Sequence, residues 1–489
     1  MSPTHVRIYS MLTALAVVAC SDSGGPDVPT HLDFVVEPSP AARGQTISPA
    51  VVVAARDEDG STVVEWPEDV SLLLESGPAG VSLEGECATP PVGGTAVFRD
   101  LSLDAAAEGY RIRATSEGLE GAVSRPFTVH DVFTGASVTA GWTHTCALDQ
   151  EGAAWCWGGN DSGQLGDGTL ASSTIPVRVD TDLRFTSLQA GAAHTCGITT
   201  EGDVWCWGMN LSGQLGNGAR TEIEAPTRVA AAQTIVSLGA GWTHTCGITE
   251  SGGILCWGNN GFGQVGDGTS GTERASPVPV RSDDRFVDVS GGFFHTCGLT
   301  ADGRALCWGR NNYGEVGDGT QEPRSEPTPV SGDLRFTSLK AGGSGCHYHT
   351  CGVATDGKTY CWGRNYQRHL SAEEIFLLTP TPIVGDPGLE RVVVGANAVC
   401  GLTGEGALHC WGTGYYGQVG NGSTEATRTP THIRPDLRFS SVSPGRYHTC
   451  AVTEDGGIHC WGLNESGQLG NEAAAQGWAV PVPVWAPVQ

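Results

Sequence analysis

Fourteen of the 17 cysteines in this chain fall into pairs whose two members are ten residues apart. The pairs are Cys146 and Cys156, Cys196 and Cys206, Cys246 and Cys256, Cys297 and Cys307, Cys351 and Cys361, Cys400 and Cys410, and Cys450 and Cys460. Paired thiols form disulfides or hold a metal as thiolates. A separation of ten is not a zinc-ligand spacing, and no second close pair accompanies each first one, so the pattern favours disulfides. Such regular pairing indicates an oxidising compartment.

A histidine stands two residues before the first cysteine in six of these pairs. These residues are His144, His194, His244, His295, His349 and His448. An imidazole can bind a metal or move a proton. A residue supplied once per unit is more typical of the unit's own construction, so we predict a hydrogen bond that ties neighbouring strands or units. We predict no metal site, no cofactor and no catalytic residue.

The cysteines and histidines belong to a unit of about 50 residues that occurs seven times. In the second unit the frame starts at Gly191 with Gly-x-x-His-Thr-Cys, continues through an apolar run and a turn, and ends in Cys-Trp-Gly. Its tryptophan is predicted to pack in the core. The seven tryptophans are Trp157, Trp207, Trp257, Trp308, Trp362, Trp411 and Trp461.

Each unit can be written as four short strands, which in the second unit are 185–188, 194–199, 204–207 and 226–229. A turn centred on Glu201 makes the middle two an antiparallel hairpin, in which Cys196 and Cys206 are opposed closely enough for a disulfide. Each such bridge contributes about 3 kcal/mol in the chain-entropy model. Four-stranded units repeated radially form a β-propeller.

The same residues carry a family resemblance. Ala190-Gly191-x-x-His194-Thr195-Cys196, followed by Trp207-Gly208-x-Asn210-x-x-Gly213-Gln214-Leu215-Gly216, resembles the regulator-of-chromosome-condensation repeat in its bacterial, cysteine-rich form. The resemblance covers all seven units and implies an all-β fold with a seven-bladed propeller over 131–489. A kelch propeller has a similar period, but its double-glycine signature is missing. The tail 480–484 matches the outer-strand motif at 276–280 and is expected to complete the ring beside the first unit.

The N-terminus has the features of an export signal. His5 and Arg7 precede an apolar run, 11–19, which is too short to span a bilayer as a stable helix, so 1–19 is predicted to be a signal peptide. Residues 17–20 resemble a bacterial lipobox, which implies lipidation of Cys20; the alternative is an ordinary secretory signal. A polar tether, 20–30, follows. We therefore expect a lipid-anchored protein of the bacterial cell envelope, facing the periplasm or the outside.

Residues 31–130 lack the repeat and contain short β-branched runs separated by turn signals, at 32–36, 51–55, 70–74, 95–98, 110–114 and 127–129. This spacing predicts a small β-sandwich. The stretches 94–103 and 109–114 resemble bacterial immunoglobulin-like surface domains, which implies a spacer or adhesion role. Cys87 in this segment and Cys346 in the fifth unit are left over, and we hypothesise a disulfide between them; the alternative is two free thiols.

The two residues before each His-Thr-Cys vary between units and are often aromatic. In a propeller they emerge together on one face around the axis, and aromatic residues with arginine are typical of binding hot spots. The candidate partner-binding residues are Trp142, Trp242, Phe293, Phe294, Tyr348, Arg446 and Tyr447. In the second unit the same slot holds only Ala192 and Ala193. The alternative is that these aromatic residues pack over the mouth of the channel.

These observations rank the function classes. The net charge of −26 disfavours nucleic acid as a partner. We therefore predict a monomeric, non-enzymatic scaffold that binds an unknown protein at the cell surface and meets the membrane only through its anchor. One alternative is a surface enzyme, a hydrolase or lyase, whose site lies in the irregular fifth and sixth units, where 344–346 are inserted and Asn397-Ala398-Val399-Cys400 replaces the usual frame. The other is a purely structural envelope component.

Overall fold

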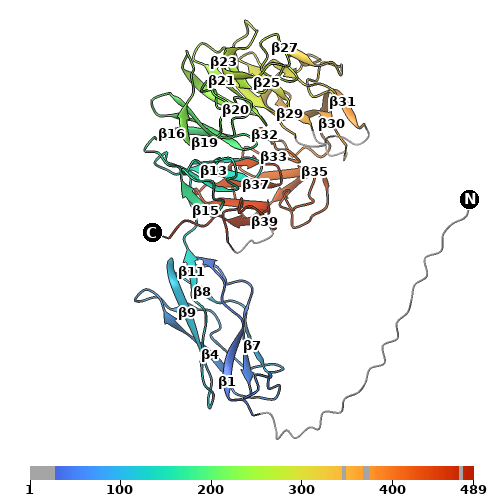
Figure 1. Ribbon diagram of the computed structural model, residues 1–489. Helices are drawn as coiled ribbons and strands as arrows, with labels where there is room; N and C mark the ends of the chain where they lie inside the picture. The colour runs from blue at the N-terminus through green and yellow to red at the C-terminus, as the bar shows by residue number, and fades with distance from the viewer. Residues whose placement is uncertain (1–27, 344–347, 367–369, 371–373, 473–476, 489) are drawn as a thin grey trace, which may run out of the picture.

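The computed structural model describes residues 28–343, 348–366, 370, 374–472 and 477–488. Every element in these ranges is a β-strand. Figure 1 shows a smaller unit, built from β1–β11, below a larger ring of sheets, built from β12–β39. The signal segment 1–19, Cys20 and most of the tether lie outside the described residues.

The smaller unit has two main sheets, ordered β1-β3-β7 and β2-β11-β9-β4-β6, with β10 on β9 and a separate β5-β8 pair. Its strands are β1 (His31–Val36), β2 (Ala41–Ala42), β3 (Val51–Arg56), β4 (Val70–Ser76), β5 (Leu83–Glu84), β6 (Ala88–Thr89), β7 (Thr95–Phe98), β8 (Ser102–Leu103), β9 (Ala107–Thr115), β10 (Ala122–Val123) and β11 (Phe127–His130). Both main sheets share one apolar core that includes Trp66, Phe98, Tyr110 and Phe127. All six predicted runs lie in strands.

In the described part of the chain, the ring consists of seven four-stranded antiparallel sheets. Sheet one holds β12 (Ser137–Ala140), β13 (His144–Leu148), β14 (Ala154–Gly158) and β15 (Ser173–Arg178); sheet two holds β16 (Phe185–Ala190), β17 (His194–Thr199), β18 (Val204–Gly208) and β19 (Ile223–Arg228). Sheet three holds β20 (Ile235–Ala240), β21 (His244–Thr249), β22 (Ile254–Gly258) and β23 (Arg274–Pro279); sheet four holds β24 (Phe286–Gly291), β25 (His295–Thr300), β26 (Ala305–Gly309) and β27 (Arg324–Pro329).

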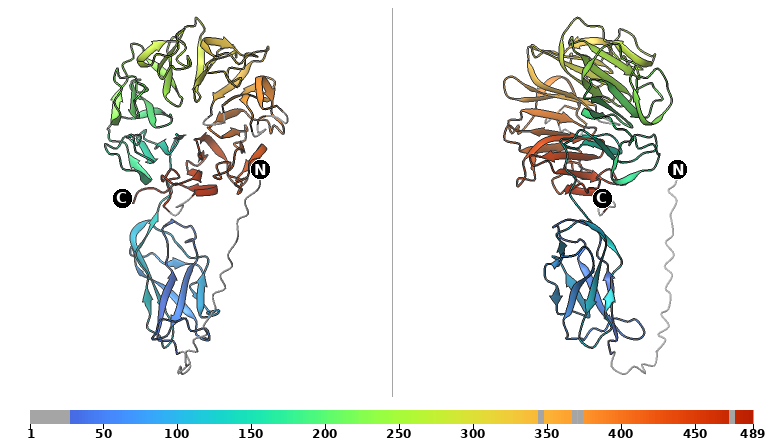
Figure 2. Two further views of the ribbon diagram at one scale, coloured as in Figure 1. Left: turned by 45° about the vertical axis from the view of Figure 1, so that its right-hand side comes forward. Right: turned by 90° about the vertical axis from the view of Figure 1, so that its left-hand side faces the viewer.

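Sheet five holds β28 (Phe336–Ala341), β29 (His349–Ala354), β30 (Thr359–Arg364) and β31 (Phe376–Pro382). Sheet six holds β32 (Arg391–Val394), β33 (Ala398–Leu402), β34 (Leu408–Gly412) and β35 (Thr427–Ile433); sheet seven holds β36 (Phe439–Pro444), β37 (His448–Thr453), β38 (Ile458–Leu463) and β39 (Gly477–Pro483). Strands pair in chain order within each sheet, and the sheets form a β-propeller around a central axis (Figure 2).

The hairpin register brings the paired cysteines together. Cys196 lies opposite Cys206 in the β17–β18 pair, and their Cα atoms are 4.1 Å apart in a disulfide. All seven pairs that the spacing predicts are disulfides of the structure. Each bridge joins the two middle strands of one sheet, so it fixes a sheet internally and does not join neighbouring sheets.

Neighbouring sheets are joined by the tryptophan of the frame. Trp207 is fully buried, and its Nε1 donates to the carbonyl of Gln164 in the preceding unit at 3.0 Å. The indole lies directly on Gly166, whose φ is +69° and where an added Cβ would come within 2.7 Å of the ring nitrogen. This close approach explains why the loop Gly-Gln-Leu-Gly needs its second glycine.

The tail forms the outer strand of sheet seven, where β39 pairs with β38. It also lies beside the first unit as expected, because Val484 packs with Val138 and Trp157 of sheet one. The ring closes through side chains: Trp157 Nε1 of sheet one donates to the carbonyl of Gln468 at 3.0 Å. The last unit therefore closes on the first with the same contact that joins consecutive units.

The smaller unit meets the propeller at sheet seven (Figure 1). Val132 forms an isolated bridge with Trp485, and Thr134 forms another with Gly457. The ring of His130 stacks on Trp485 with centroids 4.8 Å apart. These contacts attach the smaller unit to the last sheet and leave the mouth of the central axis to the propeller's own residues.

The predicted interdomain disulfide is wrong. Cys87 carries a free thiol, and its Sγ donates to the carbonyl of Leu83 at 3.5 Å inside its own unit. Cys87 also packs against the core of the smaller unit, which gives its side chain a local role. Cys346, its expected partner, lies outside the described residues.

Candidate functional site

The repeated histidines form hydrogen bonds between neighbouring sheets. In five of the six, the imidazole Nε2 pairs with the threonine hydroxyl of the next unit's His-Thr-Cys. The pairs are His144 and Thr195 at 2.9 Å, His194 and Thr245 at 3.0 Å, His244 and Thr296 at 2.9 Å, His295 and Thr350 at 2.9 Å, and His448 and Thr145 at 2.8 Å. The prediction of a bond that ties neighbouring units is thus confirmed for these five. Sheet six departs from the rule, since Ala398 and Val399 occupy the two positions.

These imidazoles are uncharged. Burial lowers the pKa of His144 and of His448 to about 3, because the apolar surroundings disfavour the cation. Among the described residues, no group of three or more histidine, cysteine, aspartate or glutamate side chains is placed to hold a metal ion. The histidines therefore serve the assembly of the ring.

The glycine of the frame sets where the variable pair emerges. The imidazole of His144 lies on Gly141, where an added Cβ would meet the ring at 2.3 Å. The two residues between them must therefore loop out at the inner end of the sheet. Their backbone is held by bonds across sheets: the amide of Trp142 donates to the carbonyl of Ala192 at 3.1 Å, and the amide of Arg446 donates to that of Gly141 at 3.2 Å. The variable side chains thus gather at one mouth of the axis.

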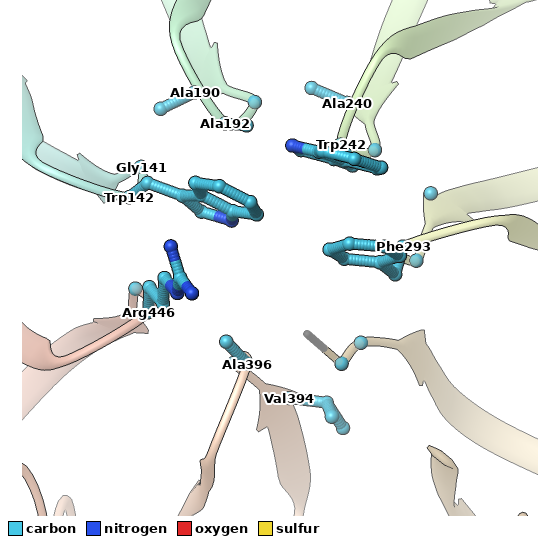
Figure 3. Close-up of a pocket in the computed structure, with 18 of the residues that line it drawn as sticks. Gly141, Trp142, Ala190, Ala192, Ala240, Trp242, Phe293, Val394, Ala396 and Arg446 are labelled. Atoms are coloured by element: carbon cyan, nitrogen blue, oxygen red, sulfur yellow. The ribbon is translucent and has the colours of Figure 1, made fainter. Parts of the chain in front are cut away.

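Three of these side chains stack on one another (Figure 3). The ring centroids of Trp142 and Trp242 are 5.3 Å apart, and those of Trp242 and Phe293 are 4.0 Å apart. The guanidinium carbon of Arg446 lies 4.1 Å from the Trp142 centroid. With Ala396 opposite, these residues surround a cavity of about 90 Å³, which we call the axial pocket.

The seven predicted face residues divide in two. Phe293 and Tyr348 are only 7% and 8% exposed, so they pack over the channel mouth. The others keep accessible surface: Trp142, Trp242, Phe294, Arg446 and Tyr447. We call all seven the inner ring. The packing alternative therefore holds for Phe293 and Tyr348, and the other five stay candidate partner-binding residues.

The structure adds a second set of aromatic side chains, which sequence reasoning missed. They come mainly from the two variable positions before each Gly-Gln-Leu-Gly, and we call them the outer ring: Phe262, Tyr313, Tyr366, Phe376, Tyr415 and Tyr416. Tyr415 and Tyr366 are 63% and 59% exposed. Phe262 touches Phe294 with centroids 4.9 Å apart, and Tyr416 touches Tyr447 at 4.7 Å. The inner and outer rings together form one aromatic face over sheets three to six and the mouth.

A buried ion pair supports this face beneath Tyr348. Arg310 Nε lies 3.3 Å from Glu315 Oε1, without hydrogen-bond geometry, and the two side chains are 9% and 1% exposed. Burial raises the pKa of Glu315 to about 7, although hydrogen bonds from backbone amides and the nearby Arg310 oppose the rise. The guanidinium carbon of Arg310 lies 3.8 Å from the centroid of the Tyr348 ring. Glu315 stands where most units have glutamine, and its burial keeps it from meeting a substrate.

No helix in the described residues is long and apolar enough to cross a membrane.

Comparisons with known proteins identify the ring. The profile of the RCC1-like domain matches residues 113–383, and profiles of the regulator of chromosome condensation (RCC1) repeat match 405–452 and 439–468. The Xenopus laevis regulator of chromosome condensation is 32% identical over 119 residues, which are 24% of this chain and 27% of that protein. The Arabidopsis thaliana ultraviolet-B receptor UVR8 is 32% identical over 88 residues, 18% of this chain and 19% of the receptor. The chain thus spans about a quarter or less of these relatives' length.

Solved structures show the same fold. Human WBSCR16 superposes with a TM-score of 0.61 at 23% identity, covering 68% of this chain and 94% of that one. Prp20p of Saccharomyces cerevisiae superposes with a TM-score of 0.56 at 23% identity, covering 63% and 80%. Because the RCC1-like profile alone matches more than half of the residues, this chain belongs to the RCC1-like domain family.

Proposed function

We propose that this chain is a lipid-anchored scaffold of the bacterial cell envelope that holds a protein partner on its aromatic face. The proposed order is a signal peptide (1–19), a tether (20–30) that starts at the lipidated Cys20, an immunoglobulin-like β-sandwich (31–130) and a seven-bladed propeller (131–489). In this arrangement the sandwich acts as a stalk that holds the propeller away from the membrane.

The aromatic face is the observation that carries the proposal. Exposed aromatic residues on a rigid surface, with arginines stacked among them, have the composition of a protein-binding hot spot. The guanidinium of Arg446 makes cation–π contacts with Trp142 and Tyr447, and that of Arg364 lies 4.6 Å from the ring of Tyr313. The axial pocket, at about 90 Å³, is far smaller than the ~300–1,000 Å³ of small-molecule sites. It suits one side chain of a macromolecule.

Proteins with the same fold support binding as the role. One yeast RCC1 structure, Prp20, is a complex with Kap60, and another report describes binding of Prp20p to Gsp1p and histones. We carry over protein binding as the class of function and none of these partners. The enzyme alternative places a site in units five and six. The described residues of these units include Tyr366, Tyr415 and Tyr416, which belong to the same aromatic face, so the two alternatives concern one surface.

Site-specific photo-crosslinking tests the face. A photoreactive phenylalanine analogue at Tyr415, which is 63% exposed, should capture one protein from intact cells. Matched controls are Leu73 in the smaller unit, 59% exposed, and Val236 at the opposite end of sheet three, 54% exposed. Capture that is equal at all three positions, or absent at both Tyr415 and Tyr416, would overturn the proposal.

Fatty-acid labelling tests the anchor. The full chain should incorporate an alkyne-bearing fatty acid, and Cys20→Ala should abolish the label. A wild-type protein that is exported but unlabelled would show that the segment is an ordinary secretory signal.

A further inference from the structure

Two arginines of the aromatic face, Arg446 and Arg364, take part in none of the 15 ion pairs of the described residues. Their positive charges are therefore not paired with a carboxylate in that part of the chain. Arg446 alone of these two lines the axial pocket.

Arg446 is poised to donate hydrogen bonds. Its guanidinium carbon lies 4.1 Å from the Trp142 centroid and 4.6 Å from that of Tyr447, which are cation–π distances. Its Nε is buried and has no hydrogen-bond partner within the described part of the chain. The cation–π contacts give the Nε–H no hydrogen-bond acceptor, and a buried donor without an acceptor is costly, so a planar carboxylate that reaches this group would satisfy it. Figure 3 shows this group at the rim of the pocket.

Apart from Arg446, the side chains that line the pocket are mainly apolar, and backbone of the frame glycines completes its lining. Trp242 and Phe293 lie across the opening from Arg446, and Val394 and Ala396 form the remaining wall (Figure 3). A side chain that enters must therefore combine an apolar stem with a charged or polar end that reaches Arg446. With about 90 Å³ available, the stem is short.

We propose that the axial pocket binds an acidic side chain, aspartate or glutamate, presented by an internal loop of the protein partner. Its carboxylate accepts two N–H bonds from Arg446, and its methylene groups pack against Trp142 and Trp242. This inference rests on the proposed function of the aromatic face and specifies what the centre of that face recognises.

Charge explains the selectivity. A lysine or arginine from the partner would meet the Arg446 cation, and a purely apolar side chain would leave its buried Nε without an acceptor. The net charge of −26 repels acidic proteins at long range, so an acid is accepted only where this local cation pairs with it. A chain-terminal carboxylate offers the same anionic group and is distinguished by the test.

The test uses the full chain and a library of random peptides displayed between two fixed protein segments, so that no peptide has a free end. We expect selected peptides to share an aspartate or glutamate beside apolar residues. Replacing that acid by its amide should weaken binding to the wild type at least tenfold, yet change binding to Arg446→Met less than twofold. The matched control is Arg184→Met, which should behave as the wild type. Arg184 is half-buried and directly precedes β16, at the end of that strand that lies away from the axial pocket.

The outcomes separate this inference from the proposed function. Peptides that lack an acid but lose binding to Trp242→Ala or Tyr416→Ala would overturn the acidic pocket and leave the face intact. Peptides that bind Trp242→Ala and Tyr416→Ala as tightly as the wild type would overturn both proposals. An amide replacement that costs the same on wild type and Arg446→Met, or binders found only with free C-termini, would overturn the acidic side chain. A melting curve for each variant identifies any loss of folding. Arg446→Lys, which keeps the positive charge, is measured beside Arg446→Met.

Discussion

Sheet three carries two tryptophans in opposite surroundings. Trp257 is 0% exposed, and its Nε1 donates to the carbonyl of Gln214 in the preceding unit at 2.8 Å. Trp242 is partly exposed and stacks on Trp142 and Phe293. The first occupies a position that is tryptophan in all seven units; the second occupies a slot that changes from unit to unit.

The difference lies in what each position touches. The buried positions contact the neighbouring unit, so a change in one unit would require a matching change in the next. The slot before His-Thr-Cys contacts solvent and other slots, so it is free to vary while the ring stays closed. The same repeat therefore builds a uniform inner scaffold and a variable face.

Substituting the two tryptophans one at a time should give the largest difference in stability between scaffold and face. Trp257→Ala should lower the free energy of unfolding by about 3–5 kcal/mol, because it leaves a cavity between sheets. Trp242→Ala should cost about 1 kcal/mol, since mainly ring stacking is lost. Urea unfolding measures both. Equal losses would contradict the division into scaffold and face.

Disulfides should show the next largest effect. Removing one bridge with Cys196→Ala and Cys206→Ala should lower the free energy of unfolding by about 3 kcal/mol, because the unfolded chain regains the freedom of the hairpin loop. Cys87→Ala, which removes the free thiol of the smaller unit, is the control and should cost under about 1 kcal/mol. A double variant as stable as the control would show that the hairpin needs no covalent link.

Acid should weaken the scaffold through its histidines. The pKa of His244 is lowered by burial from 6.5 to about 4, so the unfolded chain binds a proton first and stability falls as pH drops from 6.5 toward 4. Replacing His244 and its partner Thr296 by alanine and valine, the residues of sheet six, should remove about 1.4 kcal/mol per pH unit of that slope. Unfolding curves at several pH values measure it. An unchanged slope would mean that protonation of His244 does not contribute to the loss of stability in acid.

Sequence reasoning reached the parts of the molecule that a single unit determines. Cys196 and Cys206 oppose each other because one hairpin contains both, and six strands of the smaller unit follow from local patterns. The partners of His194 and Trp207 lie in other units, so their contacts appear only when sheets pack side by side. Two-residue strands such as β2 were missed for the same reason, since β2 pairs with the distant β11.

The face was predicted only in part, because burial of an aromatic residue depends on its neighbours around the axis. Phe293 is covered by Trp242 from the preceding unit and by its neighbour Phe294. The sequence shows that all three are aromatic but not which of them is buried. The outer ring had a signal, since Phe262 and Tyr313 occupy the same repeat position before Gly-x-x-Gly. This position varies between units in the same way as the slot before His-Thr-Cys.

The buried pair of sheet four offers the finest test, because it sits between scaffold and face. Glu315→Gln alone leaves the Arg310 guanidinium without its carboxylate and should cost about 1–2 kcal/mol at pH 8. The double change Arg310→Asn with Glu315→Gln reproduces sheet three, where Gln264 Nε2 donates to Asn259 Oδ1 at 2.7 Å, and should recover most of that loss.

The pH dependence of this pair should have the opposite sign to that of the histidines. Because burial raises the pKa of Glu315 from 4.5 to about 7, the folded protein holds this proton where the unfolded chain has lost it. The wild type should therefore lose stability relative to the double variant as pH rises from 4.5 through 7. Urea unfolding of both proteins at pH 5 and pH 8 measures the difference. A difference that is the same at both values would mean that Glu315 stays ionised in the fold, held by Arg310 as part of the rigid scaffold.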